Sequence, residues 1–242
     1  MIEEFFALNS YPALSTDRPF QDKFILLFKI YGIIFLLNFI SVPISFLAEH
    51  LVTQVLHLKS IHEQYTTSMS RLFAKFGYLQ VVFYICIMAP IIEESIFRLP
   101  LSFKRSHIAV AFGFALVVLA RLIPGLSQQN LAINILVRVA LFAAGYFALY
   151  KSLPEIKVPN KRLQTGLMIT SIVVFGLVHI FNYAPLQWNI IFIYPLFVIP
   201  QLCMGWMLTY IRFKNGFFWG MGLHALINSV SMLIYTVFKH KM

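Results

Sequence analysis

The sequence has little charge, and it is especially poor in acidic residues. Of its 242 residues, 12% are charged and only 9 are Asp or Glu, whereas 60% are hydrophobic and 25 are Phe. An ordinary soluble domain carries roughly a quarter charged residues. This composition cannot cover the surface of a soluble protein, so it excludes that class and predicts a polytopic membrane protein.

Cysteine is scarce as well. The only two, Cys86 and Cys203, both fall inside long apolar runs. In that setting we expect buried free thiols rather than a disulfide or a pair of metal ligands.

The sequence is rich in long apolar runs. About 20 residues in a helix cross a hydrocarbon core of about 30 Å, and the runs at 189–211 and 216–238 contain no Asp, Glu, Lys or Arg. Weaker candidates occur at 24–47, 77–98, 107–124, 131–150 and 163–183. The sequence therefore predicts an all-α fold, a polytopic transmembrane helical bundle of about seven spans.

The remaining segments are more polar. Residues 1–23 lack the basic stretch and apolar core of a cleavable signal peptide, so we expect a short cytoplasmic leader followed by an anchoring first span. Residues 48–76 mix apolar with charged side chains and predict a loop with an amphipathic helix at the membrane interface. We interpret 24–242 as one integral membrane domain.

The net charge of +10 lies mostly in short loops, which favours a topological role over nucleic-acid binding. In the seven-span arrangement, ten Lys and Arg residues fall on the side of the N-terminus and six on the other. The ten are Arg18, Lys23, Lys104, Arg105, Lys151, Lys157, Lys161, Arg162, Arg212 and Lys214, and the six are Lys59, Arg71, Lys75, Arg121, Lys239 and Lys241. This bias predicts a cytoplasmic N-terminus, and we expect the plasma membrane of a bacterium.

Ionisable side chains within a bilayer are costly and usually functional. In 77–98, Glu94 and Arg98 are four residues apart and share one helical face, so an ion pair explains one of two adjacent glutamates. It does not explain Glu93, whose carboxylate in a low-dielectric site would have a raised pKa and could serve as a general base. Lys29 and Arg138 also fall within spans, but snorkelling near the helix ends accounts for them.

Two further apolar runs carry polar residues on one face. In 163–183, Phe175, His179 and Asn182 follow helical spacing, and in 216–238, His224 and Asn228 are four residues apart. Each set alone could simply form hydrogen bonds between helices. Together with Glu93 they predict a shared hydrated cavity, since facing lipid would cost several kcal/mol for each group.

The residue types in this cavity suit the hydrolysis of an amide. A glutamate and a histidine can transfer protons, and a histidine with an asparagine can donate hydrogen bonds to a developing oxyanion.

Three motifs make the chain resemble a known family. They are Glu-Glu-x-x-x-Arg at 93–98, Phe-x-x-x-His at 175–179 and His-x-x-x-Asn at 224–228, in this order and in separate apolar runs, with Ala-Pro at 89–90 before the glutamates. The sequence is similar to the CAAX protease and bacteriocin-processing (Abi) family over residues 77–232. The resemblance implies an intramembrane endopeptidase that acts on a membrane-associated polypeptide, either a CAAX-type substrate or a bacteriocin-type precursor, within the lipid bilayer.

The resemblance also implies roles for single residues. Glu93 would polarise the attacking water with help from His179, while His224 and Asn228 would stabilise the oxyanion. Supporting roles would fall to Glu94, Arg98, Asn182 and Phe175.

The sequence leaves a metal cofactor open. The zinc-protease motif His-Glu-x-x-His is absent. Glu93, His179 and His224 could still supply three ligands to a zinc ion. Since the carboxylates already have assigned roles, we favour a mechanism without a metal.

Two other kinds of function are alternatives to a peptidase. A transporter with a Glu/His proton relay would be expected to show inverted repeats, and none is evident. A catalytically silent relative that acts in immunity or as a scaffold would tolerate loss of the motif residues, which are intact here. No nucleic-acid partner is expected.

Overall fold

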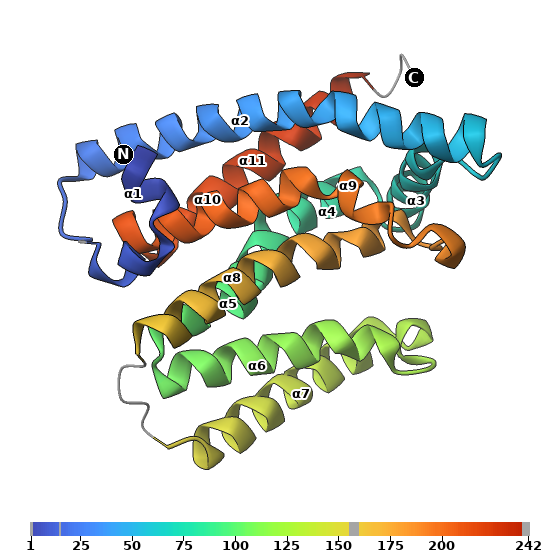
Figure 1. Ribbon diagram of the computed structural model, residues 1–242. Helices are drawn as coiled ribbons and strands as arrows, with labels where there is room; N and C mark the ends of the chain where they lie inside the picture. The colour runs from blue at the N-terminus through green and yellow to red at the C-terminus, as the bar shows by residue number, and fades with distance from the viewer. Residues whose placement is uncertain (1, 15, 155–159, 239–242) are drawn as a thin grey trace. The chain divides into compact units, whose positions relative to one another are not determined.

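The computed structural model describes residues 2–14, 16–154 and 160–238, and within these ranges the chain forms helices and no β-strand. The all-α prediction is confirmed. Lys157, Lys239 and Lys241, which were counted for topology, lie outside the described residues. The α-helices are α1 (Ile2–Phe6), α2 (Phe20–His50), α3 (Ile61–Phe76), α4 (Tyr78–Phe83), α5 (Ala89–Phe97), α6 (Arg105–Leu119), α7 (Leu131–Ser152), α8 (Lys161–Val178), α9 (Tyr194–Phe197), α10 (Ile199–Asn215) and α11 (Phe217–Phe238) (Figure 1).

Shorter turns of other helix types join these helices. Segments Leu51–Val55 and Tyr84–Met88 are π-helical, and the 3₁₀ turns are Leu8–Ala13, Leu99–Ser102, Ala120–Leu122, Leu126–Gln128, His179–Tyr183 and Trp188–Ile190. The chain divides into two compact units. Unit 1 comprises residues 1–90 and 169–242, and unit 2 comprises residues 91–168.

Among the described residues, six helical segments are long and apolar enough to cross a membrane. They are Phe20–Val55, Tyr78–Phe97, Arg105–Leu122, Leu131–Ser152, Lys161–Tyr183 and Phe217–Val237. The prediction of an integral membrane protein is confirmed, and the count is close to the expected seven.

The difference lies at 189–211, which we expected to be one continuous span. The structure divides it into a 3₁₀ turn, α9 and α10. Pro195 and Pro200 lie in the first turns of α9 and α10, where a missing N–H is tolerated because no helical partner is needed there. The prolines thus start two helices instead of continuing one, and α10 is left with 17 residues.

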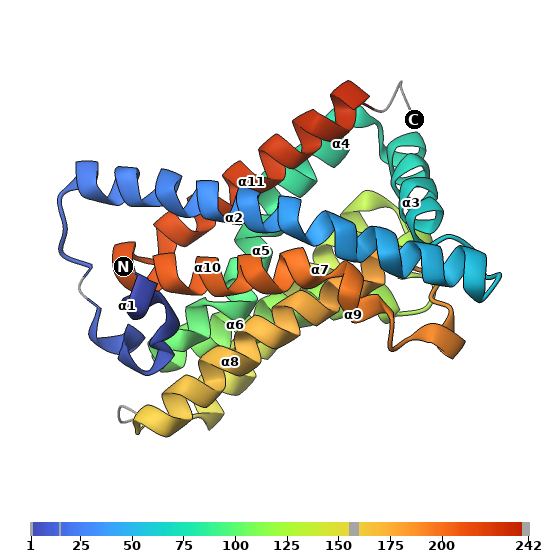
Figure 2. The same cartoon turned by 45° about the horizontal axis from the view of Figure 1, so that its top comes forward.

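Helices α9 and α10 nevertheless follow α2 in the opposite direction (Figures 1 and 2). At one end, Asn215 Nδ2 donates to Lys23 O at 2.9 Å. At the other end, Tyr194 and Phe197 belong to the same buried cluster as Ala48 of α2. Lys23 and Ala48 are 25 residues apart, or about 37 Å along a helix, which exceeds the apolar thickness of a bilayer. This broken segment therefore extends alongside α2, although it is not one of the six continuous candidate spans.

The N-terminal leader packs against α10. The Phe5 ring stacks on Trp206 with centroids 5.4 Å apart, and Trp206 Nε1 donates to the hydroxyl of Tyr11, which is fully buried. The ammonium of Lys214 pairs with the Glu4 carboxylate. Burial alone would raise the pKa of Glu4, but hydrogen bonds from Lys214 and Tyr210 and the charge of Lys214 hold this pKa below its usual value. Aromatic and ionic contacts thus fix the leader to unit 1.

Segment 48–76 forms α3, as expected, after α2 has continued further than predicted. The Glu49 carboxylate near the end of α2 accepts from the backbone N–H groups of Ile61 and His62, and Ser60 Oγ accepts from the N–H of Glu63. These bonds satisfy donors that the first turn of α3 leaves open.

Two embedded cations were expected to snorkel. Lys29 is exposed on α2, whereas Arg138 in α7 of unit 2 is held by protein oxygens. Arg138 donates to Asn134 Oδ1 at 2.7 Å and to Val117 O at 2.6 Å. Its charge is therefore stabilised by oxygen atoms of α6 and α7, and snorkelling to the membrane surface is not needed to explain it. Cys86 is buried and Cys203 is partly buried, and both are free thiols as expected.

Helices α8 and α10 approach closely at Gly176, inside the Phe-x-x-x-His motif. A Cβ at this position would lie 2.3 Å from Leu202 Cδ2 and 3.2 Å from Leu202 Cα. Part of that contact is with the backbone, so rotation of the leucine side chain cannot relieve it fully. At Gly166, on the same helix, a Cβ would meet nothing within 4 Å.

We predict opposite effects for alanine at these two glycines. Gly176→Ala should lower the free energy of unfolding by about 1–3 kcal/mol, because the added methyl group overpacks the contact with Leu202. The matched control Gly166→Ala should leave it unchanged or raise it by up to about 1 kcal/mol, since alanine favours the helix. Denaturant unfolding in detergent micelles measures both. Equal shifts of the same sign would contradict the close approach.

Candidate active site

Glu94 and Arg98 form the expected ion pair in unit 2. Arg98 Nη1 lies 3.4 Å from Glu94 Oε1, and neither side chain is exposed. The guanidinium also lies 5.8 Å from the centre of the Phe97 ring. Removing two charges from water is costly, and their mutual attraction offsets that penalty only while both are present. The pair therefore makes each of these residues dependent on the other.

Glu93 has a different environment from its neighbour. It directly precedes Glu94 on α5, so its side chain points about 100° away around the helix axis. Glu93 is partly exposed as a residue, although its Oε2 is buried, whereas Glu94 is fully buried. The two adjacent glutamates are thus physically distinct, as the sequence pattern predicts.

Unit 1 brings Phe175, His179 and His224 together. The Phe175 ring is fully buried and meets both imidazoles edge to face, with centroid distances of 4.8 Å to His179 and 5.7 Å to His224. The phenylalanine of the second motif therefore lies against the histidines of both the second and the third motif.

Phe175 also sets the tautomer of His179. The ring atom Nδ1 of His179 lies 2.7 Å from Phe175 O. A carbonyl oxygen only accepts hydrogen bonds, so Nδ1 must carry the proton. A neutral ring then presents Nε2 as an acceptor or base.

The chain changes helix type at His179. Helix α8 ends at Val178, and His179–Tyr183 forms a 3₁₀ turn. Residues three apart still share a face in such a turn. Asn182 is exposed there, whereas His179 is partly buried and His224 is only 1% exposed.

Asn228 makes a contact that the sequence pattern did not reveal. Its Nδ2 donates to the backbone oxygen of Ile85 at 2.9 Å. Ile85 belongs to the π-helical segment Tyr84–Met88, which directly precedes the Ala89-Pro90 pair. One signal was available, because a proline removes a donor from the helix turn before it.

A sequence model of the type II CAAX prenyl endopeptidase Rce1-like family matches residues 75–230. These 156 residues (230 − 75 + 1) are more than half of the chain and include all three motifs. The chain belongs to the Rce1-like family. This membership confirms the resemblance based on the motifs. Comparison with curated proteins and with solved structures gave no match.

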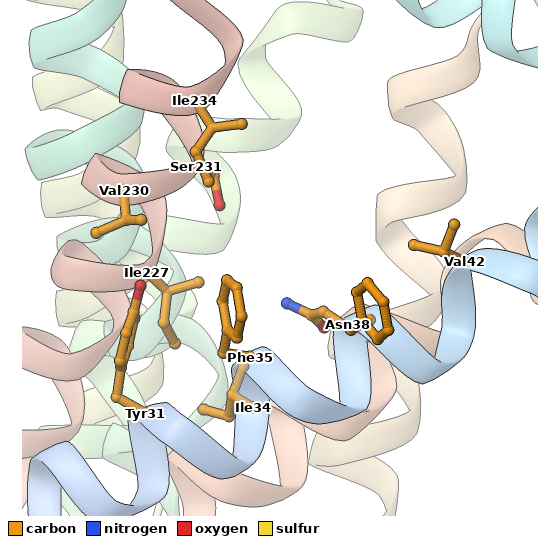
Figure 3. A pocket seen from close by; sticks show the side chains of 10 residues that line it. Tyr31, Ile34, Phe35, Asn38, Val42, Ile227, Val230, Ser231 and Ile234 are labelled. Carbon is orange, nitrogen blue, oxygen red and sulfur yellow. The ribbon is translucent and has the colours of Figure 1, made fainter. Parts of the chain in front are cut away.

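The Rce1-like chain has a groove in unit 1 beside the helix of the third motif. A cavity of about 200 Å³ lies between α2 and α11 (Figure 3). Its walls are mostly apolar, and Asn38 and Ser231 contribute polar groups. Ile227 lines the groove and is the residue before Asn228. The groove thus runs along the same helix that carries His224 and Asn228.

Of the three candidate metal ligands, Glu93 lies in unit 2, whereas His179 and His224 lie in unit 1. Among the residues that the structure describes, no group of three or more His, Cys, Asp or Glu side chains is placed to hold an ion.

Proposed function

We propose that this Rce1-like protein is an active intramembrane endopeptidase that hydrolyses a peptide bond of a membrane-associated polypeptide. The observation that carries the proposal is the family match over 75–230, which contains all three polar motifs intact. The contact of Phe175 with His179 and His224 supports it, since it places two imidazoles around one buried ring.

In the proposed reaction, Glu93 is the general base. The oxygen of a water molecule attacks the carbonyl carbon of the substrate, and one water proton passes to the Glu93 carboxylate. His179 orients the water through Nε2, because its Nδ1 proton is donated to Phe175 O. When the C–N bond breaks, the proton held by Glu93 is delivered to the leaving amine.

The developing oxyanion would be stabilised by His224 and Asn228. Asn228 has two amide hydrogens, of which one is donated to Ile85 O. The second is the one proposed for the oxyanion. Supporting roles are proposed for Glu94 with Arg98, for Phe175 and for Asn182.

We further propose a prenylated C-terminal tail as the substrate class. The family description supports it, and so does the mostly apolar groove between α2 and α11, which suits an extended hydrocarbon chain. A bacteriocin-type precursor is the alternative substrate. We also propose that the protein is located in the plasma membrane of a bacterium with the N-terminus in the cytoplasm, as the loop charges favour.

The first prediction for this function separates the two glutamates. Glu93→Gln keeps the shape of the side chain but removes the base, so cleavage of a prenylated peptide should fall by at least about 100-fold. The protein should still insert and purify normally, because the substituted amide would occupy the same partly exposed position. Glu94→Gln is the matched variant and should chiefly lower the thermal midpoint. If Glu94→Gln is inactive while Glu93→Gln cleaves normally, the assignment is reversed.

A second prediction concerns the metal. If Glu93 activates water directly, protein purified in a strong chelator should keep its activity, and elemental analysis should find well under one zinc per chain. His224→Ala should lower the rate by about 10²–10³, the usual effect of losing an oxyanion donor, without changing the metal content. Loss of activity in chelator and its recovery with zinc would refute the metal-free mechanism.

A third prediction concerns orientation. In a chain with Cys86 and Cys203 replaced by Ala, Ser152→Cys at the end of α7 should resist impermeant thiol reagents in intact cells and react after lysis. Gln129→Cys, before the other end of α7, is the matched control and should react in intact cells. The reverse pattern would place the N-terminus outside.

A further inference from the structure

The π-helical segment before the glutamates leaves one backbone carbonyl without a helical donor. The N–H of Ala89 donates to Tyr84 O, five residues earlier. In the same register, the donor for Ile85 O would be residue 90. That residue is Pro90, which has no N–H. The carbonyl of Ile85 therefore needs a partner from outside its own helix, since a buried carbonyl left unsatisfied is costly.

Helix α11 supplies this partner. Asn228 Nδ2 donates to Ile85 O at 2.9 Å, across 143 residues of sequence. Apolar packing accompanies this bond, since Val81, Cys86 and Met232 belong to one buried cluster. At the start of α4, the hydroxyl groups of Tyr78 and Thr236 of α11 also form a hydrogen bond at 3.0 Å. The asparagine thus supplies a polar contact between α11 and the π-helical segment itself.

We infer that Asn228 is a positioning residue that occupies the hydrogen-bonding gap made by Pro90, and thereby holds the segment leading into Glu93 and Glu94 against the helix of His224. On this inference, Pro90 of the Ala-Pro pair leaves the carbonyl of Ile85 without a donor, and Asn228 of the third motif supplies that donor. Its kinetic consequence rests on the proposed function, whereas its consequence for stability does not.

The test is a double-mutant cycle on the full chain in detergent micelles, with Asn228→Ala, Pro90→Ala and the two combined. With Pro90 in place, Asn228→Ala should lower the thermal midpoint by about 2–4 °C, as expected for one buried hydrogen bond in a chain of this size. In the Pro90→Ala background, a backbone N–H reaches Ile85 O in either the π or the α register. Asn228→Ala should then lower the midpoint by less than half as much. Equal losses in both backgrounds overturn the inference.

Asn215 provides a matched control for the cycle. Its Nδ2 also donates to a backbone oxygen at 2.9 Å, that of Lys23, but far from Pro90 in sequence. Asn215→Ala and Pro90→Ala should therefore act additively. A coupling as large as that of Asn228 would show that Pro90→Ala weakens the protein in general, and would overturn the inference.

A second variant keeps the inference testable if Pro90→Ala does not fold. Asn228→Asp preserves the shape of the side chain. At a pH high enough to keep its carboxylate ionised, it has no donor and would face the Ile85 carbonyl. It should lower the midpoint at least as much as Asn228→Ala. A midpoint equal to that of the unmodified protein would overturn the inference.

The kinetic measurement separates positioning from a purely chemical role. A misplaced site can lose about 10² in rate. If Asn228 acts through the gap at Pro90, Asn228→Ala should therefore lower kcat strongly when Pro90 is in place. In the Pro90→Ala background, the same substitution should lower kcat by a factor at least about tenfold smaller. If Asn228 acted only on the substrate oxyanion, the fold loss would be the same in both backgrounds, which overturns the positioning role. A protein that cleaves no peptide would refute the proposed function, while the stability cycle would still decide the inference.

Discussion

One hydrogen bond in unit 1 satisfies a backbone carbonyl that its own helix cannot serve. Pro90 cannot donate, the turn before it is π-helical, and Ile85 O is paired with Asn228 from α11. In a bilayer there is no water to replace such a bond, so backbone groups must find partners within the protein. This requirement couples the span that leads into the glutamates to the helix that carries His224. The Ala-Pro pair and the third motif, far apart in the sequence, are therefore linked by a constraint on the backbone.

A second constraint acts through Phe175, which has two kinds of contact with the histidines. Its ring packs against both imidazoles, and its carbonyl accepts the Nδ1 proton of His179. The close approach of Gly176 to Leu202 brings the backbone of this motif against α10. The phenylalanine and the glycine therefore define where His179 lies and which nitrogen it presents.

The spans and the motif residues could be predicted because both depend on local pattern. Apolar runs of about 20 residues identify helices that cross a membrane, and helical spacing correctly paired Glu94 with Arg98 and Phe175 with His179. The π-helical segment before Pro90 and the leader against α10 were not predicted, because their partners lie 143 and 201 residues away. The break of 189–211 at Pro195 and Pro200 was visible as a pattern, but hydropathy alone treats the segment as continuous.

Because charged residues are scarce in this chain, each charge inside an apolar helix needs a structural or chemical explanation. Arg138 is held by Asn134 and Val117, and Arg98 by Glu94, so each of these cations has protein oxygens that offset its removal from water. Glu93 differs from these residues because it is partly exposed and lies beside a carboxylate already held by an arginine. The turn of about 100° between adjacent helical residues gives the two glutamates different surroundings. This difference supports the role proposed for Glu93, since a general base must change charge in every turnover while the surrounding fold stays intact.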